Sequence, residues 1–154
     1  MKLTKNFSLE ELVNSETAKI NGINNNASID VLNNLEALCK NVLQPLRDHF
    51  NKPIVITSGY RCKALNKLVG GVSNSQHTTG EAVDIVMLGE NLKNVFNYIK
   101  HNLPYDQLLF EKSKSGNWIH ISYSKNNRHQ SIDNYLAWLL LFLLFVYCLP
   151  LCHG

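Results

Sequence analysis

SQHTTGEAVD, residues 75–84, is a polar loop that leads directly into an apolar segment, residues 82–88. The apolar segment has the composition of a short buried strand. A second apolar run, residues 118–123, contains His120, which lies 36 residues after Asp84. Histidine and carboxylate side chains held by a loop and two strands are suitable ligands for a catalytic metal ion. The stretch therefore predicts a small sheet that carries a metal site.

Strand alternation supports this site. The isoleucines on either side of His120 are expected to face the core, so His120 should face the opposite way. Asp84 can aim at the same place if its strand is a neighbour, and His77 would reach in from the loop. Zinc in hydrolases usually takes three such ligands and leaves a fourth position for water. The other histidines are expected to be packed or surface residues: His49, His101, His129 and His153.

The rest of the chain predicts helices before the sheet. Ser8 with Glu11 has the form of a capping box that opens a short helix. Apolar residues at helical spacing predict a long core helix. The expected order is a helix over 29–50, a strand over 54–58, helices over 62–69 and 92–99, and strands over 108–110 and 118–123. The fold class is α+β, with N-terminal helices packed on a small, mainly antiparallel sheet that holds the zinc site.

The C-terminal segment differs from the rest. Residues 135–151 carry no charge across 17 positions, slightly fewer than the ~20 that cross a bilayer as a helix. A short membrane anchor is favoured over a core helix, because the segment has no polar face. If it spans, Lys125 and Arg128 would keep the domain on the cytoplasmic side. We therefore divide the chain into a domain over 1–131 and a hydrophobic, helical tail over 132–154.

Length and composition limit the number of domains and the kinds of partner. A chain of 154 residues fits one domain and is expected to be a monomer. The net charge of +3 is spread without a basic stripe, which argues against a nucleic-acid partner. The N-terminus lacks the apolar core of a secretory signal, so synthesis in the cytoplasm is expected. No CxxC pair occurs, and reduced thiols are expected at Cys39, Cys62, Cys148 and Cys152.

Three motifs in order resemble a known family. SxHxxGxAxD, the preceding SGYR (58–61) and the later WIH (118–120) are similar to motifs of the zinc D-alanyl-D-alanine carboxypeptidases and the related phage and bacterial peptidoglycan LD- and DD-peptidases. The resemblance covers residues 2–130. It implies zinc on His77, Asp84 and His120. It also implies that Arg61 helps to hold a substrate carboxylate, a task suited to a guanidinium, whereas the alternative for Arg61 is a surface salt bridge.

The general base is less directly indicated. Many relatives place an acid three residues before the last ligand, or a histidine two residues before it, but this chain has Asn117 and Trp118 there. Glu111 is the nearest carboxylate that a short turn could fold back toward the site, and it is our predicted catalytic base. The alternative is an exposed strand residue. Glu81 is a weaker candidate, because strand alternation turns it away.

The expected function is zinc-dependent hydrolysis of peptide bonds in peptidoglycan stem peptides, as a D-Ala-D-Ala carboxypeptidase or an endolysin-type endopeptidase. The protein would be made in the cytoplasm and act at the bacterial cell wall after release, and residues 135–151 would provide membrane contact or a membrane tether. The rival hypothesis is a non-catalytic, metal-stabilised cell-wall-binding protein of the same fold. The amide at Asn117 motivates that rival.

Overall fold

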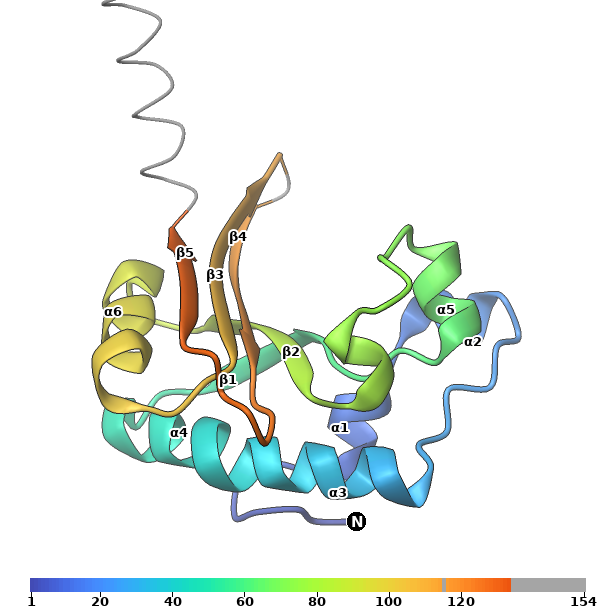
Figure 1. Ribbon diagram of the computed structural model, residues 1–154, viewed down its shortest axis with the longest axis horizontal. Coiled ribbons are helices and arrows are strands. Elements are labelled where there is room, and N and C mark those ends of the chain that lie inside the picture. The colour runs from blue at the N-terminus through green and yellow to red at the C-terminus, as the bar shows by residue number, and fades with distance from the viewer. Residues whose placement is uncertain (115, 134–154) are drawn as a thin grey trace, which may run out of the picture.

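A five-stranded sheet in the order β1-β2-β4-β3-β5 lies at the centre of the protein (Figure 1). The computed structural model describes residues 1–114 and 116–133. The first four strands of this order pair antiparallel, and β5 lies parallel to β3. The predicted α+β class with a mainly antiparallel sheet is therefore confirmed. The strands are β1 (Ile54–Ser58), β2 (Ala82–Met87), β3 (Gln107–Ser113), β4 (Gly116–Ser122) and β5 (Gln130–Asp133).

Helices cover one face of the sheet and form the core with it. The apolar residues of this face are buried, including Ile85, Phe110 and Ile119, and they pack with Leu35 and Leu38 of α3. Figure 1 shows α3 and α4 as one long run along the sheet, with α6 beside the strands. The helices are α1 (Leu9–Val13), α2 (Glu16–Ile20), α3 (Ile29–Leu38), α4 (Gln44–Phe50), α5 (Lys63–Leu68) and α6 (Leu92–Asn102).

The long helix predicted over 29–50 is continuous but not uniform. A π-helical turn, η1 (Cys39–Leu43), joins α3 to α4, and the N–H of Gln44 donates to the carbonyl of Cys39. Pro45 follows at once. Proline has no N–H and crowds the carbonyl four residues before it, so a wider turn accommodates it without ending the helix.

Two elements were not predicted. α2 buries only Ala18, so its sequence has no apolar periodicity that would predict a helix. A cap in which Ser15 accepts the N–H of Ala18 stabilises it. β5 has a polar sequence without a strand signal. The described ranges contain no helix with the length and apolar character needed to cross a bilayer. The predicted helical tail and membrane contact over 135–151 lie outside the described residues, and the boundary at 131 stays a prediction.

Gly59, directly after β1, is the point where α1 approaches the sheet. The N–H of Tyr60 donates to the carbonyl of Leu12 at 2.8 Å. A Cβ at position 59 would overlap that same carbonyl oxygen. The carbonyl of Gly59 also accepts the Nδ1–H of His77 at 2.8 Å. Only glycine at this position lets the helix, the strand and a predicted ligand meet.

We predict that Gly59→Ala lowers the free energy of unfolding by about 3 kcal/mol or more, because backbone atoms must move to admit the methyl group. Urea unfolding measures this loss. Gly89→Ala is the control: Gly89 has φ +74° and open space around it, so that variant carries only the cost of the left-handed conformation, about 1–2 kcal/mol. Equal losses in the two variants would contradict the close approach at Gly59.

Candidate metal centre and pocket

The three predicted metal ligands converge. His77 Nε2 lies 3.2 Å from His120 Nδ1 and 3.3 Å from Asp84 Oδ1, and His120 Nδ1 lies 2.9 Å from Asp84 Oδ1. They form the one group of three or more potential metal-ligating side chains found among residues 1–114 and 116–133. Three side chains that are separated by up to 43 residues in the sequence therefore meet at one point.

Strand register places two of these ligands. Asp84 on β2 is the direct cross-strand partner of His120 on β4, so both side chains leave the sheet on the same face. The residues flanking His120 are fully buried on the opposite face, as strand alternation predicted. The third ligand, His77, is buried in a short 3-10 helix, η2 (Gln76–Thr79), which replaces the predicted loop. Ser75 caps η2 by accepting the N–H of His77.

The contact with Gly59 determines which nitrogen of His77 is available. A carbonyl oxygen can only accept, so Nδ1 of His77 must carry the proton in the bond to Gly59. The neutral ring then has its lone pair on Nε2, the atom that faces Asp84 and His120. Fixing the ring of a ligating histidine through its other nitrogen is the usual arrangement in metal sites.

The donor set fits a zinc ion. Tetrahedral zinc with bonds of about 2.0–2.1 Å places its ligand atoms roughly 3.3 Å apart. The three separations observed here, 2.9 to 3.3 Å, are close to that value. Burial raises the pKa of Asp84, but the contacts with His120 and His77 outweigh that effect and hold the pKa well below its usual range. Asp84 is therefore ionised, as a metal ligand must be.

A pocket of about 470 Å³ opens beside the three ligand atoms. Its wall includes the three ligands together with Arg61, Glu111 and Trp118. The ligand atoms lie at its wall rather than enclosed in the core, so one side of a bound ion would face the pocket. This is the feature that separates a catalytic site from a closed structural one.

Comparison with known proteins agrees with this site. A family model described as Peptidase M15 matches residues 5–122. The chain belongs to the peptidase M15 family. The match confirms the resemblance carried by SxHxxGxAxD, SGYR and WIH, and membership of this family indicates a zinc-dependent peptidase. No curated protein matches the chain.

Arg61 of this M15 peptidase lies at the pocket wall in a turn that is held from several sides. Its N–H donates to the carbonyl of His77 at 3.1 Å. Asn25 is buried and fixes the same turn, donating to the carbonyl of Tyr60 and accepting the N–H of Cys62. Burial lowers the pKa of Arg61, and the charges of Asp84 and Glu111 oppose that shift.

The Arg61 side chain makes no ion pair within the described residues. Its Nε is buried without a hydrogen-bond partner in the part of the chain that the structure describes. No salt bridge to Arg61 is present there either, so the alternative of a surface salt bridge has no support within that part. The guanidinium instead lines the pocket beside the metal ligands.

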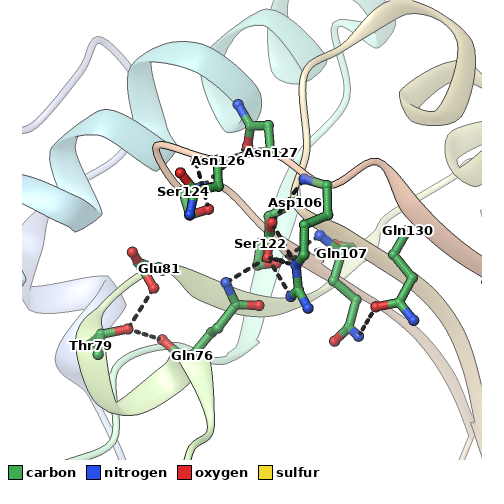
Figure 2. Close-up of polar contacts among 11 residues, drawn as sticks. Gln76, Thr79, Glu81, Asp106, Gln107, Ser122, Ser124, Asn126, Asn127 and Gln130 are labelled. Carbon is green, nitrogen blue, oxygen red and sulfur yellow. Dashed lines mark hydrogen bonds and ion pairs between the residues drawn. The ribbon is translucent and has the colours of Figure 1, made fainter.

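Glu111 lies on the pocket side of β3. Leu109 is the cross-strand partner of His120, and Glu111 is two residues further along, opposite Trp118. Alternation puts Glu111 on the same face as His120, and the pocket wall includes both. Glu81 instead accepts a hydrogen bond from the hydroxyl of Thr79 at 2.9 Å, outside the pocket lining (Figure 2).

A buried carboxylate behind the pocket was not predicted. Asp106 is 2% exposed and accepts hydrogen bonds from the guanidinium and backbone N–H of Arg128 and from the amide of Gln76. Figure 2 shows the Gln76 amide directed at Asp106. A single aspartate before a strand gives no sequence signal for such a network. The same is true of Asn25, one of three consecutive asparagines.

We predict that His120→Ala reduces bound zinc from one ion per chain to nearly none, because two protein ligands rarely retain zinc. Elemental analysis of the purified, dialysed protein measures this. His101→Ala, an exposed position on α6, should keep its zinc. A His120→Ala protein with a full zinc content would remove His120 from the ligand set.

We predict that the loss of stability caused by Asp106→Asn depends on pH. Hydrogen bonds from Arg128 hold the pKa of Asp106 below its ordinary value, so the folded-state pKa lies below the unfolded value of about 3.9. The resulting stabilisation is present above about pH 5 and is lost as the pH falls below about 4. Wild type should therefore have the higher Tm at neutral pH, with the gap to Asp106→Asn narrowing in acid.

Thermal unfolding of both proteins between pH 7 and pH 3 measures the gap. Asp48→Asn, at an exposed position of α4, is the matched control and should change Tm little at any pH. A gap between wild type and Asp106→Asn that stays constant down to pH 3 would show that the Asp106 charge does not contribute.

Proposed function

We propose that this M15 peptidase hydrolyses peptide bonds in the stem peptides of bacterial peptidoglycan with a zinc ion held by His77, Asp84 and His120. One observation carries the proposal: the three ligand atoms meet at the wall of an open pocket that also holds a carboxylate and a guanidinium. Zinc there would polarise the peptide carbonyl and lower the pKa of water to about 7.

Glu111 is the proposed general base. It takes a proton from the attacking water and returns it to the nitrogen of the departing amine, so one carboxylate serves both halves of the reaction. Support comes from its position on the same sheet face as His120 and in the same pocket wall. The hairpin between β3 and β4 thus supplies a carboxylate although Asn117 carries an amide.

Arg61 is the proposed substrate clamp. Its guanidinium binds a carboxylate of the stem peptide and so orients the peptide across the metal ligands. Its place in the pocket wall and the tightly held turn favour this role, since the turn fixes the backbone of Arg61 beside the metal ligands. A C-terminal carboxylate at Arg61 corresponds to the carboxypeptidase mode, and an internal acidic group corresponds to the endopeptidase mode.

The proposed setting is the bacterial cell wall, reached after synthesis in the cytoplasm and release from the cell, as for an endolysin. The competing hypothesis is a wall-binding protein that keeps the zinc but does not cleave. Asn117 motivates that hypothesis, and the carboxylate of Glu111 in the pocket argues against it.

We predict that Glu111→Gln lowers turnover of isolated peptidoglycan by roughly 10²–10⁴-fold while one zinc ion stays bound, because the amide cannot accept the proton. Release of free amino or carboxyl termini measures turnover, and elemental analysis measures zinc. Glu81→Gln is the matched control and should keep wild-type turnover, because Glu81 lies outside the pocket lining.

The same assay separates the two hypotheses. Wild-type protein that binds zinc and sediments with the wall, yet releases no termini, would establish the binding protein and reject the peptidase. Unchanged turnover in Glu111→Gln would keep the peptidase and move the base to another group.

A further inference from the structure

The pocket extends along β3 to both sides of the metal ligands. Its wall includes Gln107, Leu109 and Glu111, which are alternate residues on one face of the strand. Four residues of strand span about 13 Å, enough for an extended peptide of about four residues. Leu109 is paired with His120, so the metal ligands lie midway between the Glu111 end and the Gln107 end.

Arg128 provides a second guanidinium at the Gln107 end. It lines the pocket and is bonded to Asp106, the residue before Gln107. Arg128 Nη2 donates to Asp106 Oδ2 at 2.6 Å, and Nε donates to both oxygens at 3.0 and 3.1 Å. The backbone N–H of Arg128 adds a bond to Oδ1 at 2.9 Å. One edge of the guanidinium is thus fixed by a buried carboxylate.

Both oxygens of the Asp106 carboxylate accept hydrogen bonds from within the protein. Besides the donors of Arg128, the carboxylate accepts the amide of Gln76, the neighbour of the ligand His77, at 2.9 Å. Four donor groups therefore occupy its two oxygens. The chain of bonds from Arg128 through Asp106 to Gln76 ties this end of the pocket to η2.

The other edge of the Arg128 guanidinium remains open. Its side chain is 57% exposed, and Nη1 has no hydrogen-bond partner in the two described ranges. A guanidinium has five N–H groups in a rigid plane, and an edge that is not used internally matches a carboxylate. A salt bridge that served stability alone would not need to lie in the wall of this pocket.

We propose that Arg128 is a specificity-determining residue that binds a second carboxylate of the substrate, about two residues from the cleaved bond and on the side away from Glu111. This inference rests on the proposed function. The stem peptide offers such a group in the α-carboxylate of its γ-linked D-glutamate. Arg61 and Arg128 together would then select an acidic peptide.

A matched pair of synthetic stem peptides tests this role. The two peptides differ only in whether the D-glutamate α-carboxylate is free or amidated. Wild type should prefer the free acid by roughly tenfold or more in kcat/KM, the range of a charge-assisted hydrogen bond. Arg128→Gln should raise KM for the free acid by the same factor, with kcat and the values for the amide little changed. In Arg128→Gln the ratio of kcat/KM for the free acid to kcat/KM for the amide should therefore fall to about one.

Two further variants separate binding from folding. Arg128→Gln leaves Asp106 buried without its cation, so the double variant Asp106→Asn, Arg128→Gln removes both charges together. The ratio of the two peptides is measured on one preparation, so it does not depend on how much protein is folded. Arg47→Gln on α4, outside the pocket lining, makes the same change in net charge and should keep the wild-type preference.

An unchanged preference in both Arg128 variants would overturn the inference and leave the peptidase intact. If wild type cleaves neither peptide, the proposed function fails, and calorimetric binding of the same two peptides decides the inference separately. Tighter binding of the free acid that is lost in Arg128→Gln would support it. Equal binding of both peptides to wild type would reject it.

Discussion

The cross-strand pairing of Asp84 with His120 is the constraint on which the rest of the site depends. Because side chains alternate along a strand, a slip of one residue between β2 and β4 would turn one of these ligands into the core. The buried isoleucines on either side of His120 oppose that slip, since it would expose them. The hydrophobic core therefore fixes the register, and the register fixes the metal ligands.

The pocket has an ordered arrangement of charge. The Asp84 carboxylate lies with the two ligand histidines, Glu111 lies toward the hairpin, and Arg61 and Arg128 are the positively charged residues of the wall. Both arginines are held by groups outside the pocket: the turn that carries the Arg61 backbone is fixed by Asn25, and the guanidinium of Arg128 is bound by Asp106. A site whose charged groups are positioned before the substrate arrives loses less free energy in ordering them.

Much of this could be predicted from sequence, because the decisive signals are local. Alternation placed Asp84 and His120 on one face, and the short hairpin placed Glu111 near them. The π turn at Cys39–Leu43 and the polar strand β5 were missed, because neither changes the apolar pattern that sequence analysis relies on. Asp106 was missed for another reason. Its partners, Gln76 and Arg128, lie 30 and 22 residues away, and only the folded chain brings them together.

The contact at Gly59 connects the N-terminal helix to the metal centre in both directions. The backbone around this glycine bonds to Leu12 of α1 through Tyr60 and to the ring of His77 through its own carbonyl. Any ion that binds His77 and selects the folded state must, by thermodynamic linkage, also oppose detachment of that helix. Binding of an ion at the site should therefore also increase the resistance of the first thirteen residues to proteases.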